Sequence, residues 1–559
     1  MAAIDGGGLV AAALAAEGVR CLFTVSGGGL MPIYNACAEQ GIRVVHTRTE
    51  GAAAFMADGW ARTTGQPGVC LVTLGPGVSN AVTGLLSATM ASVPFVLLAG
   101  RAPIGVADLG TPQGTEQLPL VRPVTKYART VYEPRRIPEY LAAAFRQARG
   151  GRPGPVYLEF PADVLGATID DSTVAPAAPG RLPSRPMADP AAVAAAAALI
   201  HRAQRPIVVS GSGVWWSGAS EELRAFVATV GAPAFTGRMS RGAVPPGDPC
   251  YGGIASVSVN DVFLKAVGAC DLVVLVGGRF DHMLGFGRPP TFSAAAKAIQ
   301  IDIAAEEIGR NRPVDVGIVA DAKTALCQLR DALGEPQARE DWLAQVRAER
   351  GRVIGERVAL ELSDEVPIHP LRLLREIRQA LAPGAVVAVG SGDIDFWGES
   401  YFEPDEAGCY LRSGQVGALG SDIPYGVAAK LAHPDRQVLV LVGDGGFGYA
   451  AMELETAVRQ RAPLVVVIGN DRAWGMIQRQ QGYVYGKKGQ VATDLTDCAY
   501  EKVAEALGGY GERVREPGQL KGALARAFAA GVPACLNVDI AGVPSPELNY
   551  MFRSMKRLV

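Results

Sequence analysis

Short apolar runs alternate with segments of helical spacing along most of the chain. Residues 21–25, 68–74 and 93–99 are continuous apolar runs, typical of strands that are buried on both faces of a parallel sheet. Apolar positions recur at helical spacing over 51–63 and 78–90, between those runs. This regular alternation predicts a doubly wound parallel sheet with helices on both faces.

The same alternation occurs in three stretches of the chain. We therefore predict three α/β domains and a C-terminal tail, at residues 1–172, 190–333, 367–540 and 541–559. A stretch rich in Pro and Ala, 174–190, predicts a linker between the first two domains. The charged stretch 335–365 predicts a helical connector between the second and third.

Composition limits the class of protein. Of the 559 residues, 49% are hydrophobic and 19% charged, which predicts a large core and excludes a disordered chain. The net charge of −2 gives no indication of a nucleic-acid surface. We expect a small-molecule partner, no nucleic acid and no membrane.

Cysteine usage and hydropathy predict the compartment. The nine cysteines are scattered, and none forms a CxxC pair, so no disulfide framework is expected. No apolar run approaches transmembrane length, and the N-terminus lacks the basic region of a signal peptide. These features predict a cytoplasmic protein.

A turn with a carboxylate follows the apolar run 437–442. The turn is Gly443-Asp444-Gly445, and a second apolar run, 464–468, brings Asn470 and Asp471 to the same sheet edge one βαβ unit later. Ligands of open α/β sheets bind at this edge. Two oxygen ligands there suit a hard cation such as Mg²⁺, held jointly with a diphosphate. The alternative is an ordinary βαβ unit with acidic turns.

These motifs and four others together resemble the thiamine-diphosphate-dependent enzymes. The other segments are GGGLMPIYNA at 27–36, TEGAAAFMADGWAR at 49–62, TLGPGVSNAVTGLLSA at 73–88 and RPVTKYA at 122–128. They are most similar to the branch that includes acetolactate synthase, benzaldehyde lyase, oxalyl-CoA decarboxylase and 2-hydroxyacyl-CoA lyase. The resemblance covers the whole chain. It implies pyrimidine-binding, central and diphosphate-binding α/β domains, with thiamine diphosphate and Mg²⁺ as cofactors.

The resemblance also assigns the diphosphate and metal site. The implied metal ligands are Asp444, Asp471 and the backbone carbonyl of Ala473. Asp471 stands where the family has Asn, so this site carries one more negative charge. The other residues implied to bind the cofactor here are Gly392, Gly443, Gly445, Gly446, Trp474, Gly475 and Met476.

On the pyrimidine side, the resemblance makes Glu50 the carboxyl that hydrogen-bonds the cofactor ring and activates it. The alternative for Glu50 is a helix-capping carboxylate. Gly75-Pro76-Gly77 would let the backbone approach the ring, or form a plain βα turn. Leu419 aligns with the apolar residue that wedges between the two rings, and its alternative is core packing.

The predicted substrate pocket consists of Gly28, Gly29, Pro112, Gln113, Met476 and Gln480. Gln113 matches a Gln that reaches substrate in related enzymes, and its alternative is a solvated loop residue. No His stands near Gly28 and Gly29, so the proton relay of benzaldehyde lyase is not supported. The Trp that selects the second keto acid in acetolactate synthase is absent near Gln480.

The central domain leaves its ligand open. The segment GGRFDHMLGFGRPP at 277–290 begins like acetolactate synthase, which binds FAD there, and continues like 2-hydroxyacyl-CoA lyase. Asp302 follows a predicted strand, where a carboxylate can bind an adenosine ribose. FAD, the ADP part of CoA and an empty site all remain open.

The first expectation for activity is a 2-hydroxyacyl-CoA lyase-like reaction, from a 2-hydroxyacyl-CoA to an aldehyde or ketone plus formyl-CoA. The alternatives are an acetolactate synthase-like carboligase that acts on pyruvate and a non-catalytic relative. A CoA thioester is therefore a candidate substrate. The resemblance implies at least a homodimer, with a homotetramer as the expected assembly. Residues 544–559 are expected either to cover bound substrate or to be disordered.

Overall fold

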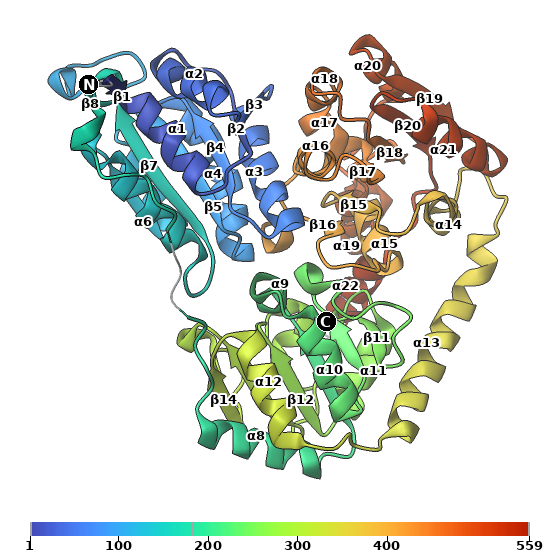
Figure 1. The fold of residues 1–559 in the computed structure, drawn as a ribbon. Coiled ribbons are helices and arrows are strands. Elements are labelled where there is room, and N and C mark those ends of the chain that lie inside the picture. The colour runs from blue at the N-terminus through green and yellow to red at the C-terminus, as the bar shows by residue number, and fades with distance from the viewer. Residues whose placement is uncertain (1–2, 181–183, 557–559) are drawn as a thin grey trace. The chain divides into compact units, whose positions relative to one another are not determined.

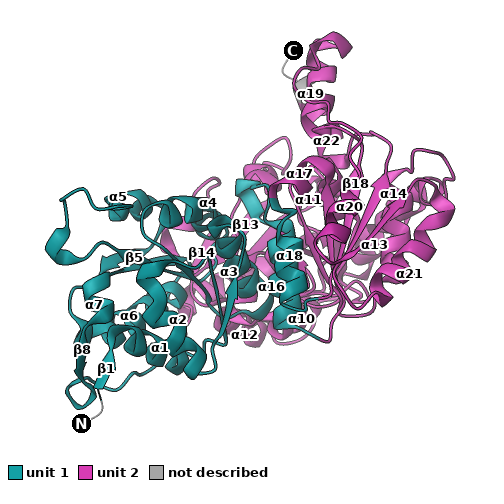
Figure 2. Cartoon of the chain, turned by 90° about the horizontal axis from the view of Figure 1, so that it is seen from above, with its two compact units in different colours: residues 1–183, 413–434, 450–462 teal, residues 184–412, 435–449, 463–559 magenta. Residues whose placement is uncertain are grey.

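The computed structural model describes residues 3–180 and 184–556 (Figure 1). Contacts divide the chain into two compact units (Figure 2). Unit 1 comprises residues 1–183, 413–434 and 450–462, and unit 2 comprises 184–412, 435–449 and 463–559.

Unit 1 is built on a six-stranded parallel sheet of described residues, in the order β3-β2-β4-β5-β7-β6. These strands are β2 (Cys21–Thr24), β3 (Arg43–His46), β4 (Gly68–Val72), β5 (Phe95–Arg101), β6 (Tyr127–Thr130) and β7 (Pro155–Pro161). A short antiparallel pair, β1 (Ala3–Asp5) and β8 (Thr168–Asp170), lies outside it. The helices of this unit are α1 (Gly6–Ala16), α2 (Met31–Glu39), α3 (Glu50–Thr64), α4 (Pro76–Ala91), α5 (Gln117–Val121), α6 (Ile137–Arg149), α7 (Ala162–Gly166), α16 (Asp422–Ala432) and α18 (Glu453–Arg459).

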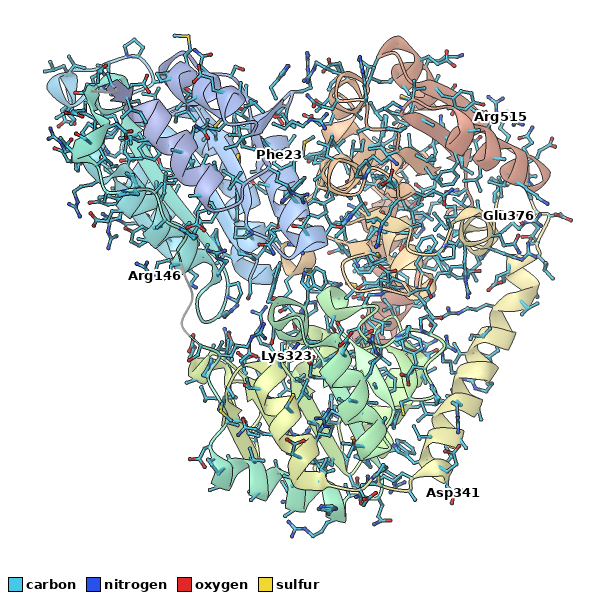
Figure 3. All side chains as sticks on the ribbon, viewed as in Figure 1. Phe23, Arg146, Lys323, Asp341, Glu376 and Arg515 are labelled. Atoms are coloured by element: carbon cyan, nitrogen blue, oxygen red, sulfur yellow. The ribbon has the colours of Figure 1, made fainter. Side chains whose placement is uncertain are left out.

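The central strands of this sheet are buried on both faces, as their continuous apolar runs predict. In β4, all five residues are buried, and alternate residues such as Val69 and Leu71 join the core cluster on one face. Phe23 of β2 is fully buried, whereas Arg146 of α6 is exposed (Figure 3). Every ladder of the sheet is parallel, because a helix connects each strand to the next.

A buried polar network packs α16 against α3 and α4 within unit 1. Arg62 donates two hydrogen bonds to the Asp58 carboxylate, at 2.9 and 3.0 Å. Ser87 donates to the same carboxylate at 3.1 Å, and so does the hydroxyl of Tyr425 from α16. Asp58 and Tyr425 are fully buried. Burial of the Asp58 carboxylate is costly unless it is hydrogen-bonded, and these hydrogen bonds offset that cost.

Unit 2 contains two six-stranded parallel sheets of described residues. The first has the order β11-β10-β9-β12-β13-β14 and uses β9 (Pro206–Ser210), β10 (Ala234–Thr236), β11 (Tyr251–Ile254), β12 (Leu272–Val276), β13 (Lys297–Asp302) and β14 (Val316–Val319). The second has the order β16-β15-β17-β18-β20-β19 and uses β15 (Val386–Val389), β16 (Tyr410–Leu411), β17 (Val438–Gly443), β18 (Val465–Asn470), β19 (Tyr510–Val514) and β20 (Ala534–Asp539).

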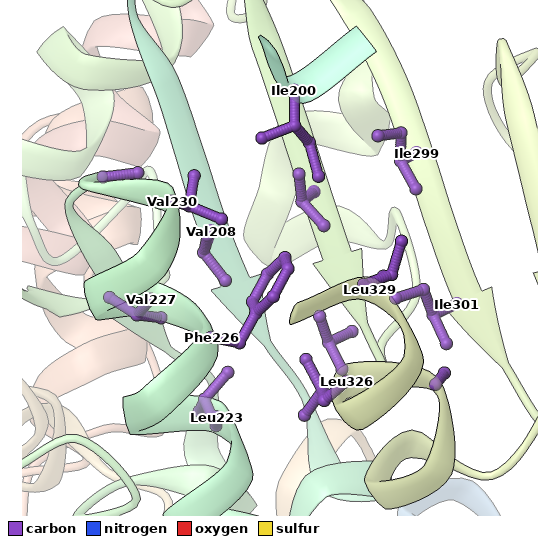
Figure 4. Close-up of a cluster of buried hydrophobic side chains, with 14 of the residues drawn as sticks. Ile200, Val208, Leu223, Phe226, Val227, Val230, Ile299, Ile301, Leu326 and Leu329 are labelled. Carbon is purple, nitrogen blue, oxygen red and sulfur yellow. The ribbon is translucent and has the colours of Figure 1, made fainter. Parts of the chain in front are cut away.

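The core of the first sheet of unit 2 has two sides. Val208 and Ile299 pack with Phe226 of α10 (Ser220–Val230) and Leu326 of α12 (Ala322–Leu333) on one face (Figure 4). The neighbouring strand residues, such as Ile207, belong to a separate cluster on the other face. This alternation is what a doubly wound sheet requires, and it confirms the predicted fold class.

The helices of unit 2 include a long connector and a terminal helix. They are α8 (Pro190–Arg202), α9 (Ser212–Ser217), α10 (Ser220–Val230), α11 (Asp261–Ala269), α12 (Ala322–Leu333), α13 (Glu340–Glu361), α14 (Pro370–Ala380), α15 (Asp393–Tyr401), α17 (Asp444–Ala450), α19 (Gly475–Tyr485), α20 (Tyr500–Ala506), α21 (Leu520–Ala529) and α22 (Pro546–Lys556). The connector expected over 335–365 is the helix α13. The tail forms the helix α22 instead of a disordered segment; residues 557–559 and the side chains at 555 and 556 lie outside the described part of the chain.

Short 3-10 helices complete the described chain. They are η1 (Gly28–Leu30), η2 (Ile104–Val106), η3 (Arg122–Val124), η4 (Pro134–Arg136), η5 (Asp171–Thr173), η6 (Arg238–Ser240), η7 (His282–Gly287), η8 (Ala305–Glu307), η9 (Gly414–Val416), η10 (Lys487–Gly489) and η11 (Pro517–Gln519). The nine cysteines, which all lie within the described residues, have free thiols. No helix within 3–180 or 184–556 is both long and apolar enough to cross a membrane. The predicted domain limits stay predictions, because the two compact units each combine several separate segments of the chain and do not follow those limits.

Candidate active site

The predicted site residues form two groups, one in each unit. Unit 1 holds Gly28, Gly29, Glu50, Gly75, Pro76, Gly77, Pro112, Gln113 and Leu419, and unit 2 holds Gly392, Gly443, Asp444, Gly445, Gly446, Asp471, Ala473, Trp474, Gly475, Met476 and Gln480.

Glu50 is the first residue of α3 and is half-buried. The hydroxyl of Thr49 caps this helix by accepting from the amide of Ala52 at 3.1 Å, so Glu50 is not the cap. Instead the Asn80 side chain donates from Nδ2 to Glu50 Oε2 at 3.0 Å. The carboxyl is therefore held by a neighbouring helix and is favoured by its place at a helix N-terminus.

Gly75 lies at a close approach of two backbones. Its φ is +63°, and an added Cβ would stand 2.5 Å from the carbonyl oxygen of Gln113. The Gly75 amide donates to Gln117 Oε1 at 2.6 Å, and Gln117 Nε2 donates to the buried Glu159 at 2.8 Å. Gln117 and Glu159 thus fix the turn that was predicted to face the cofactor ring. Sequence reasoning missed both, because a single buried polar residue has no periodic signal.

The structure brings the Gln113 loop to the Gly75 turn through the backbone. The Gln113 side chain is exposed in unit 1, as is Pro112 beside it. Gln113 has a φ of +60°, an uncommon value for a residue with a side chain, and such values cluster at functional sites. Gly28 and Gly29 are exposed in η1.

Gly77 and Leu419 complete the group in unit 1. An added Cβ at Gly77 would stand 2.9 Å from Thr73 Cγ2, so this residue serves the packing of α4, which Pro76 begins. Leu419 is half-exposed in the segment between η9 and α16. Its partial exposure within unit 1 leaves the side chain free for a contact outside the core.

Asp444 begins α17 directly after β17, where the sequence predicted a turn. The residue is 2% exposed. Its Oδ1 accepts from the amide of Gly445 at 3.0 Å, while its buried Oδ2 has no hydrogen-bond partner among the described residues. Burial and the neighbouring Asp471 carboxylate raise the pKa of Asp444 to about 7.

The two residues after β18 have different environments. Asn470 is buried, donates from Nδ2 to Asn537 Oδ1 at 2.9 Å and accepts from the amide of Arg472 at 3.1 Å, so it shapes the loop. Asp471 carries an ion pair with Arg479. Ala473 is buried and forms an isolated bridge with Asp494.

Glycines make room in this loop for larger groups. An added Cβ at Gly445 would stand 2.6 Å from the Trp474 ring, so the ring packs directly on the turn that carries Asp444. An added Cβ at Gly475 would overlap both the Asp471 carboxylate and the Arg479 guanidinium. At Gly446, it would stand 3.0 Å from the side chain of Val442.

Two charged residues of this region were not predicted from the sequence. Arg479 of α19 forms ion pairs with Asp471 and with Asp393, whose Oδ2 lies 3.0 Å from Arg479 Nη1. Asp393 is the first residue of α15, directly after the predicted cofactor-binding residue Gly392. Burial raises the pKa of Asp393 above its usual range. These contacts join segments far apart in sequence, which no local pattern reveals.

The predicted pocket residues Met476 and Gln480 are half-buried on α19. The terminal helix α22 lies against this helix. Gln480 Nε2 is 3.8 Å from Met551 Sδ. The Tyr483 and Phe552 rings stack at 4.2 Å, and the Tyr483 hydroxyl donates to the Phe552 carbonyl at 3.0 Å. The C-terminal segment is therefore a structured neighbour of the predicted substrate residues.

The central domain shows a close glycine contact at the predicted nucleotide edge. An added Cβ at Gly213 would stand 2.7 Å from Gly277 Cα, so these two turns pack backbone to backbone. Asp302 ends β13, and its Oδ1 accepts from the amide of Ala304 at 2.9 Å. Neither feature selects among the open ligands.

The donor set of unit 2 fits a hard divalent cation. Asp444 offers a buried oxygen with no hydrogen-bond partner among the described residues, and Asp471 raises its pKa. A cation bound between two such carboxylates would relieve their repulsion. Carboxylate and carbonyl oxygens are the ligands that Mg²⁺ prefers.

Comparison with known proteins identifies the family of the chain. Residues 4–120, 193–329 and 390–538 match, in turn, the N-terminal TPP binding domain, the central domain and the C-terminal TPP binding domain of thiamine pyrophosphate enzymes. The acetolactate synthase large subunit IlvG of Mycobacterium tuberculosis is 34% identical over 548 residues, covering 98% of this chain and 97% of the relative.

Two further relatives carry a different name. A 2-hydroxyacyl-CoA lyase of Oryza sativa subsp. japonica is 32% identical over 572 residues, covering 98% of each chain. The 2-hydroxyacyl-CoA lyase 2 of Homo sapiens is 32% identical over 546 residues, covering 90% of this chain and 84% of the relative. The chain therefore belongs to the thiamine pyrophosphate enzyme family, in the branch of the acetolactate synthases and 2-hydroxyacyl-CoA lyases.

Proposed function

We propose that this thiamine-diphosphate-dependent lyase or carboligase has a 2-hydroxyacyl-CoA lyase-like activity. It would cleave a 2-hydroxyacyl-CoA between C1 and C2 to an aldehyde or ketone and formyl-CoA. The observation that carries this choice is the packing of α22 on α19, through Phe552 on Tyr483 and Met551 beside Gln480. A structured C-terminal helix beside the predicted substrate residues suits a large thioester substrate and the exclusion of water from it.

We propose that Asp444, Asp471 and the Ala473 carbonyl hold Mg²⁺, which in turn binds the diphosphate. The orphaned Asp444 Oδ2 supports this assignment. Gly445 and Gly475 support it too, because they have no side chains. Trp474 can therefore pack against Gly445, and the Asp471 carboxylate can lie beside Gly475. When bound, thiamine diphosphate supplies the electron sink that allows a bond next to a carbonyl to break or form.

Glu50 is proposed to hold and exchange a proton with the ring nitrogen of the cofactor. Its hydrogen bond from Asn80 keeps the carboxyl in one orientation. The Gly75 turn, held by Gln117, is proposed to let the backbone approach the same ring. Leu419 is proposed to wedge against the cofactor, and Gln113 to contact substrate.

An acetolactate synthase-like carboligase that acts on pyruvate is the second candidate. Relatives of both names match this chain at nearly equal identity. The segment Gly277-Gly278-Arg279-Phe280-Asp281 also favours it, by resemblance to acetolactate synthase. The absent Trp near Gln480 weighs against it.

Purified enzyme, loaded with thiamine diphosphate and Mg²⁺, should be assayed in parallel with pyruvate and with a 2-hydroxyacyl-CoA. The proposal predicts formyl-CoA and an aldehyde or ketone from the second substrate. It predicts little carbon dioxide or acetolactate from pyruvate. Efficient acetolactate formation with no cleavage of the thioester would select the second candidate, and neither reaction would favour a non-catalytic relative.

We also propose that the active unit is at least a homodimer, with a homotetramer as the expected assembly, in the cytoplasm. Nine free thiols are consistent with a reducing compartment. The Gly213–Gly277 edge of the central domain is proposed as the place for any FAD or ADP moiety, and an empty edge is the alternative.

A further inference from the structure

Arg479 lies between two carboxylates in unit 2. Its guanidinium forms an ion pair with Asp471 and another, at 3.0 Å, with Asp393. The three side chains are only 12%, 10% and 6% exposed, respectively. Charges this far from water interact strongly, so the balance of their signs affects any ion that binds beside them.

The surrounding chain is built around this pair. Gly475 has no side chain where one would overlap both Asp471 and Arg479. An added Cβ at Gly542 would stand 3.0 Å from Arg479 Nη2, so a second glycine borders the guanidinium. Asp393 Oδ1 accepts from the amide of Ser545 at 3.1 Å, which ties the carboxylate to the segment before α22. The position of Arg479 is therefore set from several sides.

The charges of this cluster add to a definite value. Asp444, Asp471 and Asp393 bring three negative charges when ionised, and Arg479 brings one positive charge. Asp444 and Asp393 both interact electrostatically with Asp471. With all three carboxylates ionised, the cluster carries two negative charges, which a divalent cation neutralises.

We propose that Arg479 is a positioning residue that sets the charge of the cation site. It neutralises one of three carboxylates and pairs with Asp471 through Oδ2, so that Oδ1 is the Asp471 oxygen that remains for a cation. The site is thereby matched to a divalent cation instead of a trivalent one. This inference rests on the proposed cation site at Asp444 and Asp471.

The test measures cation binding to the full-length protein without thiamine diphosphate. Mg²⁺ affinity is measured by calorimetry. Tb³⁺ is a hard cation that also prefers oxygen ligands, and its luminescence is sensitised by a nearby indole such as Trp474, which packs on Gly445. The quantity of interest is the ratio of the Tb³⁺ affinity to the Mg²⁺ affinity.

Arg479→Gln and Asp393→Asn change the charge in opposite directions and leave the two proposed carboxylate ligands in place. We expect the ratio to rise about tenfold in Arg479→Gln and to fall about tenfold in Asp393→Asn, because the two cations differ by one charge. The double variant restores two negative charges, and its ratio should return to within about threefold of wild type. Arg479→Lys keeps the charge and should keep the ratio.

Arg513→Gln is the matched control. Arg513 lies in the same unit, its side chain is 11% exposed, and it also pairs with two carboxylates, Asp497 and Asp539. A general loss of folding would weaken the binding of both cations, but it would not shift the affinity ratio in opposite directions in Arg479→Gln and Asp393→Asn. Equal ratios in all variants would overturn the role of Arg479. If Asp444→Asn left Mg²⁺ and Tb³⁺ binding unchanged, the cation site itself would be wrong, and the inference with it.

Discussion

Asn80 of α4 donates a hydrogen bond to the carboxylate of Glu50, the first residue of α3, at 3.0 Å. The contact joins two helices of unit 1 that begin at the same edge of one sheet, after β3 and β4. It gives Glu50 a fixed partner, so that the orientation of the carboxyl does not depend on bound cofactor. Both residues can be tested separately.

Glu50→Gln should keep thiamine diphosphate binding and lower turnover by at least about a hundredfold, because Gln has the shape of Glu but no ionisable proton. Calorimetry measures binding, and NMR measures exchange of the reactive C2 proton of the cofactor. Glu133→Gln, at an exposed carboxyl of the same unit, should change neither quantity. Wild-type exchange in Glu50→Gln would show that another group activates the cofactor.

Asn80→Ala should lower turnover by roughly tenfold, since a hydrogen bond to a charged group contributes about 1.5 kcal/mol or more. The fold should be unaffected, because Asn80 is exposed on α4. Steady-state kinetics with a melting curve separate the two effects. Unchanged kinetics would mean that Glu50 does not need this partner.

Mixed oligomers test whether two chains share each site. Glu50→Gln and Asp444→Ala chains should each be inactive, yet equal mixing with subunit exchange should restore about a quarter of wild-type activity if each site of a dimer takes Glu50 from one chain and Asp444 from the other. Activity is assayed after co-refolding or co-expression. A mixture as inactive as its components would place both residues of a site on one chain.

Phe552→Ala should raise KM for a CoA substrate by about three- to tenfold, because stacked aromatic pairs contribute about 0.5–1.5 kcal/mol. Thiamine diphosphate affinity should not change. Tyr485→Ala removes an aromatic ring of the same helix α19 that is 73% exposed, and it serves as the control. Truncation after Val543 should have the larger effect of the same kind, although it also removes the buried Leu548. Wild-type KM in both forms would exclude a lid.

Asp58→Ala should lower the free energy of unfolding by about 3–5 kcal/mol, because it removes the carboxylate that forms an ion pair with the buried Arg62. Calorimetry of the thermal transition measures the loss. A double change, Asp58→Leu with Arg62→Met, should be less destabilising than Asp58→Ala alone. Stability equal to wild type in the single variant would mean that the network contributes nothing to the docking of α16.

The sequence by itself determined the α/β architecture, and it was sufficient to identify the motifs that contain the proposed catalytic and metal-binding residues. Strands β2 and β4 begin at the residues where the apolar runs 21–25 and 68–74 begin, and the three parallel sheets follow from the same signal. The reason is that a strand buried on both faces must be apolar throughout, whatever its neighbours are. The motifs around Glu50 and Asp444 could also be identified from the sequence, because each motif is a short run of consecutive residues that includes glycines and a backbone turn.

Three strands at sheet edges, β14, β16 and β19, were not predicted, and the tertiary structure decided them. Strand β16 has only two residues, and β14 and β19 have few buried positions, so they carry no periodic pattern. They form because a neighbouring strand offers hydrogen bonds. Asp444 begins a helix instead of a turn for a similar reason, since Trp474 and the loop after β18 pack against it.

The polar partners of the site were decided by tertiary structure alone. Asn80 contacts Glu50, and Arg479 contacts Asp393. Each pair is far apart in the sequence, so no local sequence pattern indicates that the two side chains meet. The sequence also did not decide whether the segment that forms α22 is ordered, because a short amphipathic helix is stable only when its apolar face is packed. Leu548 is fully buried and Phe552 stacks on Tyr483, so packing supplies the stability that the segment lacks alone.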